Sequence, residues 1–558
     1  MKRLPFLRRV SSLNLLSLLL LHLHSAEAGS ATWNAAPVNG NWFSAPNWTP
    51  ATIPQATADT ATFGSSTTTN ITSAVFNVGS VVFQPGASAY TFTPFNPFNY
   101  KMSGPGIIND SGVVQNFLLP AVPQFIGDEE VENLWTFAGT ATAGSLTQYT
   151  LFGSTEADDK TASGGGMSFI EGATAEAANF IVNAGLGSGD NRGEGGVVLF
   201  YDTSTAANAT FTLAGGTVSL GFPAFVFFQE NSTAANASFT VNGGTVAQGV
   251  GGNLVFASTS AVGNATVTCN GGGVAGALGG VATLSTLGSA TVIANGGVDA
   301  GGRIFFVTTA GGTARLEAFG NGQLDVSGGL TTGSIEGDGS VVLGAHNLSV
   351  GANNLSTTFT GVISGSGGSL TKTGKPALTL TGANLYTGGT TVTGGTLNVN
   401  NTSGSGTGTG PVEVRAGTLG GNGIIAGDVS IGGDPTKIAM LSPGGAQQAT
   451  LTIQGALTFL SSTYTCTYQG NSQRVQADQV VANGVNLINQ PGFNFPGKTR
   501  GALRVGTVLK IINNTAATPI AGRFGNLADG AIIAVAGGNF QANYEGGDGN
   551  DLTMTVVP

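Results

Sequence analysis

Few side chains in this 558-residue sequence could take part in nucleophilic, acid–base or metal chemistry. The chain has three histidines and two cysteines, and His346 is the only histidine after residue 28. Its setting, Leu-Gly-Ala-His-Asn-Leu, is typical of a corner between strands. Cys269 and Cys466 are far apart and each lies in alternating sequence, which favours buried small hydrophobes over a zinc site or a disulfide. The sequence therefore predicts no metal site, no cofactor and no catalytic residue.

Carboxylates could still serve in the cleavage of a polysaccharide. Glycoside hydrolysis needs two carboxyl groups about 5–9.5 Å apart in a cleft. The acidic runs at residues 128–132 and 156–159 are typical of solvated loops. The nearest candidates for such an acid–base set are Arg303, Arg315, Glu317 and Asp325, and no recognisable motif joins them. A polysaccharide lyase or glycoside hydrolase is therefore kept as the alternative to a non-enzymatic function.

Two glycine-rich segments resemble known ligand loops. Residues 492–499, Gly-Phe-Asn-Phe-Pro-Gly-Lys-Thr, have the spacing of a phosphate-binding P-loop. Pro491 precedes the segment, Pro496 interrupts it and no helix pattern follows it, so we interpret the match as chance. Residues 546–551, Gly-Gly-Asp-Gly-Asn-Asp, resemble a single copy of a calcium nonapeptide, whose sites need stacked copies. A turn between two strands is the simpler interpretation, and whether Asp548 and Asp551 bind calcium is left open.

Aromatic and basic residues suggest two further surfaces. The aromatic group near the start of the chain comprises Trp33, Trp42, Phe43 and Trp48. These side chains could stack on sugars, but we expect them to cover an open end of the fold. The basic group near the end comprises Lys498, Arg500, Arg504 and Lys510. It could contact an anionic surface polysaccharide, but scattered surface cations are the simpler interpretation.

Internal repeats define the elements that carry these residues. Six similar segments, at steps of 24–31 residues, open on Ala178, Ala209, Ala237, Ala265, Ala290 and Ala314. Most alternate apolar residues with threonine, as Phe211 and Leu213 do, and most end on a Gly-Gly pair. A period of two predicts strands with one apolar face, and the glycines predict sharp corners. The step is the length of one coil of a parallel β-solenoid, whereas a β-sandwich array would need units of about 100 residues.

The composition agrees with such a fold. The chain has 91 glycines, 41% hydrophobic residues and only 9% charged residues, against about 25% charged in ordinary domains. Charge-driven disorder is excluded because charge is scarce, and collagen is excluded because the glycines have no three-residue period. The formal net charge is −10, which makes nucleic acid a poor partner.

The first 28 residues have the pattern of a removable secretory signal. Cations at Lys2, Arg3, Arg8 and Arg9 precede a leucine-rich stretch at residues 13–23, and Ala-Glu-Ala follows at residues 26–28. Cleavage near Ala28 would send the chain out of the cytoplasm. After it no segment approaches the roughly 20 apolar residues that span a bilayer, so we expect no membrane-spanning segment in the mature chain.

A family resemblance enters after residue 360. Residues 368–397 resemble the autotransporter-associated β-strand repeat, with its order of Leu, Lys, Gly, Leu, Leu, Gly, Asn, Tyr, Gly, Thr, Val, Gly and Leu. The departure is Lys375-Pro376, where the family usually has a small residue. The resemblance implies a right-handed parallel β-helix that is secreted or displayed on the cell surface. No membrane-barrel pattern precedes Pro558, so we expect a passenger-type protein that does not translocate itself.

These inferences define one overall hypothesis. The fold class is all-β, a parallel β-helix with an N-terminal Trp-rich cap and a C-terminal β cap. The expected divisions are a signal peptide at 1–28, a cap with the first coils at 29–110, a repeat solenoid at 111–360, the passenger-type repeat with following coils at 361–490 and a C-terminal cap at 491–558. We expect a secreted or outer-membrane-associated rod that acts in adhesion, matrix or polysaccharide interaction, with polysaccharide or other cell-surface components as partners.

Overall fold

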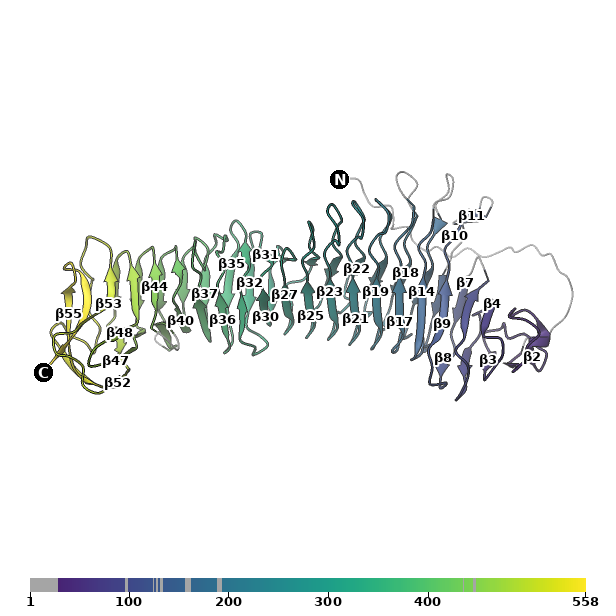
Figure 1. Cartoon of the computed structure of the whole chain (residues 1–558), viewed down its shortest axis with the longest axis horizontal. Helices are drawn as coiled ribbons and strands as arrows, with labels where there is room; N and C mark the ends of the chain where they lie inside the picture. Colours follow the sequence, from purple (N-terminus) through teal and green to yellow (C-terminus); the bar gives the residue numbers. More distant parts are fainter. Residues whose placement is uncertain are drawn as a thin grey trace.

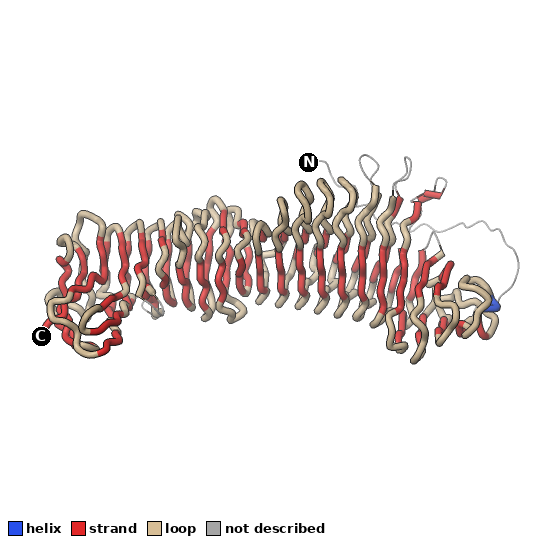
Figure 2. Tube along the Cα trace, viewed as in Figure 1, coloured by secondary structure: helices blue, strands red, loops and turns tan. Residues whose placement is uncertain are grey.

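The protein is a long rod built almost entirely of short strands (Figure 1). The computed structural model describes residues 29–95, 99–123, 125–126, 129–130, 134–155, 162–187, 193–434, 436–444 and 448–558. The strands lie across the rod and stack along its length, and loops form the corners (Figure 2). The predicted signal peptide at residues 1–28 lies outside the described residues.

Two long parallel ladders form opposite walls through much of the rod. The first ladder has 11 strands. In order they are β7 (Asn99–Met102), β13 (Leu134–Phe137), β16 (Gly166–Phe169), β18 (Val197–Phe200), β20 (Phe225–Phe228), β22 (Asn253–Phe256), β24 (Val281–Leu284), β26 (Arg303–Phe306), β28 (Gln323–Asp325), β31 (Ser340–Val342) and β34 (Val362–Ser364).

The second ladder runs in one continuous order nearly from end to end of the rod. Its strands are β4 (Asn70–Ala74), β6 (Thr91–Pro94), β9 (Gln115–Leu119), β14 (Thr147–Leu151), β17 (Asn179–Val182), β19 (Thr210–Leu213), β21 (Ser238–Val241), β23 (Thr266–Cys269), β25 (Thr291–Ala294), β27 (Arg315–Ala318), β30 (Ser334–Gly337), β33 (Thr357–Phe359), β36 (Ala377–Leu380), β38 (Thr396–Val399), β40 (Gly417–Gly421), β43 (Ala439–Pro443), β46 (Thr463–Thr465) and β51 (Gly492–Asn494).

The predicted stacking of the six repeats is confirmed. Phe180, Phe211 and Phe239 occupy the same position on successive strands of the second ladder, and each pair is parallel and in register. Each strand alternates buried and less buried residues, as the period of two predicts. The chain is therefore a parallel β-helix in which each repeat is one coil.

Aromatic side chains fill the core of this part of the rod in two facing stacks. On the first ladder Phe200, Phe228 and Phe256 stack with ring centroids 4.4 Å apart and rings parallel within 3°. On the second ladder Phe211 and Phe239 stack at 4.9 Å and meet the first stack edge-on. Both geometries are favourable for aromatic pairs, and each coil buries its ring only because its neighbours do the same.

The coils become shorter in the second half of the rod. Asn242 and Asn270 are equivalent residues of successive coils 28 residues apart, whereas Thr379 and Asn398 are only 19 apart. A third parallel sheet of eight strands starts here. Its strands are β29 (Leu330–Thr332), β32 (Asn347–Val350), β35 (Ser369–Lys372), β37 (Thr390–Val392), β39 (Val412–Val414), β42 (Val429–Gly432), β45 (Leu457–Leu460) and β50 (Val485–Ile488).

The N-terminal end is closed by aromatic packing. The sheet here comprises β2 (Trp48–Thr49), β1 (Ala31–Trp33), β3 (Thr60–Phe63), β5 (Ser80–Phe83) and β8 (Gly106–Asn109), and a 3-10 turn, Ala45–Asn47, precedes β2. β2 is antiparallel to β1 and ends the sheet. Trp33, Trp42 and Trp48 are at most 2% exposed, and their indole N–H groups donate to backbone carbonyls. These tryptophans cover the core and are not available as a sugar platform, whereas Phe43 is 41% exposed.

The C-terminal end is closed by antiparallel strands. A seven-stranded sheet runs through β41 (Ile424–Ile425), β44 (Thr450–Ile453), β49 (Gln479–Ala482), β53 (Val508–Asn514), β56 (Asp551–Val557), β55 (Gly538–Gly546) and β54 (Ile532–Val535). A three-stranded side sheet contains β48 (Val475–Ala477), β47 (Tyr468–Asn471) and β52 (Gly497–Arg500). Two short antiparallel pairs lie near the N-terminal half, β10 (Val122–Pro123) with β15 (Ala162–Ser163) and β11 (Phe125–Ile126) with β12 (Glu129–Glu130).

Candidate functional site

The segment that resembles a passenger repeat forms one full coil and the start of the next. Leu378 pairs with Leu397 and Leu380 with Val399, one coil apart in the second ladder, and all four are buried. Leu370 is the first leucine of the motif; it lies on the third sheet and pairs with Thr390 one coil later. The leucines at 370, 378, 380 and 397 therefore face the core, whereas Leu385 is exposed. The step from Leu378 to Leu397 is the length of one coil.

Lys372 is a buried lysine of this motif, and it has no acidic partner among the described residues. It is 1% exposed, and its ammonium group donates to the carbonyl oxygens of Thr373, Gly374 and Gly394. Gly394 lies in the equivalent corner one coil later, so the lysine ties two corners together. Burial lowers the pKa of Lys372 to about 8.

Asn384 and Tyr386 serve the same structural purpose. Asn384 is 3% exposed; its Oδ1 accepts the N–H of Ile363 from the preceding coil at 2.8 Å, and its Nδ2 donates to Gly406 of the following coil at 2.6 Å. The Tyr386 hydroxyl lies 2.7 Å from the Thr390 hydroxyl in the core, and burial raises the pKa of the phenol above its usual value. The motif therefore holds coils together and does not form a reaction site.

One cluster of charged side chains lies on the outer face of the second ladder. Arg315 Nε is 3.1 Å from Glu317 on the same strand and forms a short contact with Glu336 on the next. Burial raises the pKa of Glu317, and the hydrogen bond to Glu336 raises the pKa of Arg315. The two carboxylates thus share one arginine, whose positive charge they more than balance.

The other two residues of the predicted acid–base set lie elsewhere. Arg303 and Asp325 are on strands of the first ladder, the opposite wall of the rod. Arg303 donates to Gln323 at 3.0 Å and covers the ring of Phe305 at 5.1 Å, while Asp325 accepts the N–H of Ser327. The structure therefore brings together Arg315 and Glu317 and adds Glu336. Sequence reasoning missed Glu336 because coils are shorter here than in the six repeats.

Acidic side chains at the corners of successive coils accept hydrogen bonds from backbone N–H groups. The carboxylate of Glu171 accepts the N–H of Gly139 at 2.7 Å, Asp202 accepts that of Glu171 at 2.8 Å, and Glu230 accepts that of Asp202 at 2.8 Å. Each carboxylate thus caps the coil before it. Of the two acidic runs, residues 128, 131–132 and 156–159 lie outside the described residues, and Glu129–Glu130 form β12.

The segment with P-loop spacing is two strands. Gly492–Asn494 form β51, and Gly497–Arg500 form β52 in the side sheet. A phosphate-binding loop needs a helix N-terminus after the glycines, which this arrangement does not provide.

The calcium-like segment is a turn between β55 and β56, as its simpler interpretation predicted. Asp551 is fully buried; its carboxylate lies 2.6 Å from Lys510 Nζ and accepts the N–H of Asn514 at 2.9 Å. Both oxygens therefore face protein groups. Across the described residues, no group of three His, Cys, Asp or Glu side chains is placed to hold a metal ion.

The cysteines and the histidine take structural positions. Cys269 and Cys466 are both free and buried, and burial raises the pKa of each thiol. Cys466 Sγ lies 3.1 Å from the carbonyl oxygen of Asp478. His346 is exposed in the corner between β31 and β32.

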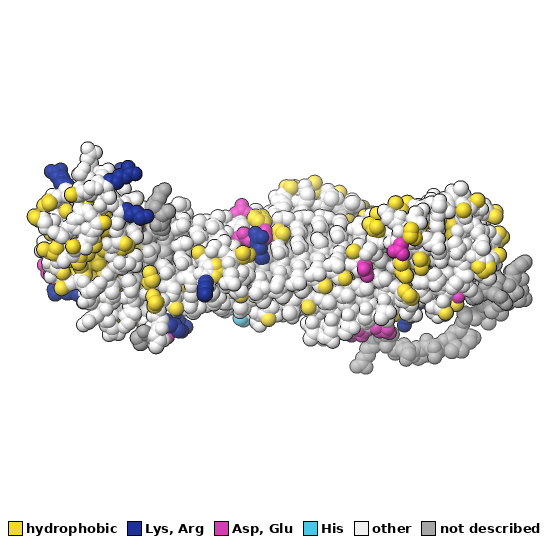
Figure 3. Space-filling view, turned by 90° about the horizontal axis from the view of Figure 1, so that it is seen from below, with side chains coloured by type: hydrophobic (Ala, Val, Ile, Leu, Met, Phe, Trp, Pro, Cys, Tyr) yellow, Lys and Arg dark blue, Asp and Glu magenta, His cyan; other side chains and the backbone are white. Residues whose placement is uncertain are grey.

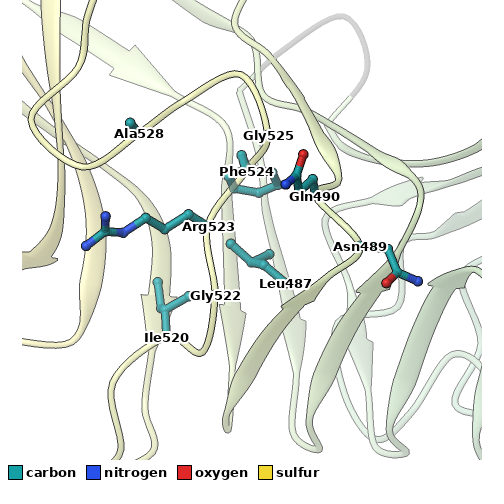
Figure 4. Close-up of a pocket in the computed structure, with 9 residues that line it drawn as sticks. All are labelled: Leu487, Asn489, Gln490, Ile520, Gly522, Arg523, Phe524, Gly525 and Ala528. Carbon is teal, nitrogen blue, oxygen red and sulfur yellow. The ribbon is translucent and has the colours of Figure 1, made fainter.

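A shallow depression of about 660 Å³ lies beside the C-terminal cap (Figure 4). Its lining residues are Leu487, Asn489, Gln490, Ile520, Gly522, Arg523, Phe524, Gly525 and Ala528. Arg523 is the only ionisable side chain in the lining, and its guanidinium lies 3.8 Å from Asp529. The depression has no acid–base pair.

The outer surface of the rod carries regular rows of small polar groups. The amides of Asn242, Asn270 and Asn295 form a ladder with hydrogen bonds of 2.9 and 2.8 Å between successive coils. Outward positions on the second ladder are mostly hydroxyls, as in Thr240 and Thr268. The long faces therefore present repeated hydroxyl and amide groups rather than a cleft.

Comparisons with known proteins agree with the architecture. Residues 370–399 match the family model of the Passenger-associated-transport-repeat. Over 105 residues the chain is 38% identical to the "Adhesin BmaC autotransporter" of Brucella suis biovar 1 (strain 1330). The match covers 19% of this chain and 3% of that protein, so the chain spans only a small part of this relative. Within the described residues no helix is long and apolar enough to cross a membrane. The chain therefore carries one passenger-type transport repeat at residues 370–399 and is similar over a short stretch to an autotransporter adhesin.

Proposed function

We propose that the chain is an exported, non-enzymatic rod that acts at the cell surface or after secretion in adhesion, matrix or polysaccharide interaction. Three features support the proposal. Residues 1–28 have the pattern of a secretory signal. The similar Brucella protein is described as an adhesin. The strands stack into one continuous rod with long sides (Figure 1).

The proposal that the rod is not an enzyme is supported by the charged side chains, which are bound to other protein groups. Arg315 is held by two glutamates, Asp551 by Lys510, and Glu171 by a backbone N–H. General acid–base catalysis needs a group free to exchange a proton with a substrate in a cleft. Repeated hydroxyl and amide rows suit extended, weak, additive contacts instead.

The test expresses the full chain with an epitope tag in the exposed turn around Leu355. We expect the tag on intact cells or in the medium, and we expect beads coated with purified rod to adhere to cells or polysaccharide films. Retention of the tag in the cytoplasm would contradict the export proposal. Beads that adhere no better than beads coated with albumin would contradict adhesion.

The enzymatic alternative has its own test at Arg315, Glu317 and Glu336. Purified rod is incubated with a panel of acidic and neutral polysaccharides, and new reducing ends and unsaturated products are measured. We expect no turnover above that of the Glu336→Gln variant. Turnover that this substitution abolishes would overturn the non-enzymatic proposal.

A further inference from the structure

The side sheet near the C-terminal end carries exposed cations in an otherwise acidic chain. Lys498 and Arg500 alternate with half-buried residues on β52, so both point outward from the same face. Arg474 is exposed at the turn between β47 and β48, and Arg504 is exposed shortly after β52. Figure 3 shows lysine and arginine side chains gathered at this end of the rod.

These four cations have no acidic partner among the described residues. Apart from the exposed Lys375, the other cations in the described C-terminal third are paired: Arg415 contacts Glu413, Lys437 contacts Asp434, Lys510 contacts Asp551 and Arg523 contacts Asp529. Of the four cations singled out in the sequence, Lys510 is neutralised by Asp551, and the exposed Arg474 joins the other three. The result is a local positive surface on a chain whose net charge is −10.

Neutral amides lie between the cations on the same sheet. Gln469 is opposite Lys498 on one side and opposite Gln476 on the other, and Asn471 is opposite Arg500. Gln469 donates to Gln448 at 3.2 Å, and Gln448 donates to the carbonyl oxygen of Gln476 at 2.7 Å. The exposed face is thus a row of amides edged by cations.

The sheet is firmly supported from below. The ring of Tyr468 lies directly under Gly497, where a Cβ atom would come within 1.9 Å of it. Tyr468 also stacks on Phe495 at 4.4 Å, and its hydroxyl donates to the carbonyl oxygen of Ala536 at 2.6 Å. A fixed β52 keeps the Cα atoms of Lys498 and Arg500 at the roughly 6.6 Å spacing of alternate strand residues, so the backbone needs little ordering on binding.

We propose that this face, formed by Gln469, Asn471, Arg474, Lys498 and Arg500, binds a polyuronate chain, a polysaccharide with a carboxylate on each sugar. The guanidinium groups match planar carboxylates as two-pronged donors, and the amides match ring hydroxyls as donors and acceptors. Duplex DNA is a poorer fit, because it carries one charge per roughly 1.7 Å of its axis, so the acidic remainder of the rod repels it more strongly than a chain with one carboxylate on each sugar. The inference rests on the proposed surface function and names its ligand.

The test measures retention of the full mature chain on immobilised polygalacturonate across a salt gradient. The variant R474Q/K498Q/R500Q is compared with the control K375Q/R415Q/K437Q, which removes the same charge from exposed sites elsewhere in the C-terminal half. We expect the first variant to lose at least tenfold in affinity and the control to stay within twofold of wild type. Circular dichroism and melting temperature verify that both variants fold.

Other outcomes would overturn this inference. Equal loss in both variants would indicate general charge attraction, and equal binding to neutral dextran would remove the role of the carboxylates. Tighter binding to duplex DNA, heparin or anionic vesicles than to polygalacturonate would assign the face to another ligand. If wild-type beads adhere to cells and the triple variant adheres equally, the adhesive function stands and this site assignment falls.

Discussion

The side-chain amide of Asn526 pairs with both backbone polar groups of Phe493. Phe493 N–H donates to Asn526 Oδ1 at 2.8 Å, and Asn526 Nδ2 donates to the Phe493 carbonyl oxygen at 2.8 Å. Phe493 is the middle residue of β51, the last strand of the second ladder. The amide therefore occupies the place of a further coil and blocks an edge that would otherwise template aggregation.

Replacing Asn526 with Ala should destabilise this end of the rod. The change leaves two backbone groups without partners, so we expect the free energy of unfolding to fall by about 1–3 kcal/mol and the Phe493 amide to exchange faster with deuterium. Asn539→Ala, which removes an exposed hydrogen bond to the last residue, is the control and should cost about 0.5 kcal/mol or less. Unchanged protection of the Phe493 amide would contradict the cap.

The aromatic stack predicts that two nearby phenylalanines contribute very differently to the free energy of unfolding. Phe228 stacks on both neighbours at 4.4 Å and is fully buried, whereas Phe225 on the same strand faces outward. We expect Phe228→Ala to lower the free energy of unfolding by about 3–5 kcal/mol and Phe225→Ala to cost about 1 kcal/mol or less. Denaturant titration measures both, and equal costs would show that the stack does not stabilise the rod.

Lys372 predicts a defined dependence of stability on pH. Its pKa is about 8 in the folded chain, against 10.5 for a lysine in the unfolded chain. Between these values the unfolded chain binds a proton that the folded chain has released, so the free energy of unfolding rises with pH across this window. The buried tyrosines oppose this above pH 10, because burial raises the pKa of Tyr90 and Tyr100 to about 12.

Comparison with Lys372→Met isolates the lysine. Methionine cannot titrate, so the tyrosine contribution is common to both proteins and cancels in the difference. We expect wild type to gain stability relative to the variant from pH 8 to 10.5. Urea titrations at several pH values measure this difference, and a difference independent of pH would show that the ammonium is not desolvated.

The turn at residues 546–551 predicts insensitivity to calcium. Asp551 is buried against Lys510, so chelation should leave the melting temperature unchanged. Asp551→Asn removes the charge and should cost about 1.5–3 kcal/mol, because Lys510 loses a charged partner. Asp548→Asn, in the same turn, is the control and should change stability little. A melting temperature that rises with added calcium and loses this rise in Asp548→Asn would establish a metal site.

The sequence predicted the coil because its evidence is local and repeated. The spacing of Phe211, Phe239 and their equivalents gives strand, corner and coil length together. The buried tryptophans and the turn before β56 were also predicted, because each is decided by a few adjacent residues. The pairing of the charged groups was not predicted: Glu336 was missed, and Lys510, which was expected to be a surface cation, is paired with Asp551.

The amino-acid sequence by itself determined the parallel β-helix, because each coil pairs with a near copy of itself and alternation sets which side chains face the core. Only the tertiary structure decided which charges neutralise each other and how the ends are closed. Those contacts join residues whose register depends on how the coil length changes along the rod, as for Arg315 with Glu336, or on a cap that folds back over it, as for Phe493 with Asn526.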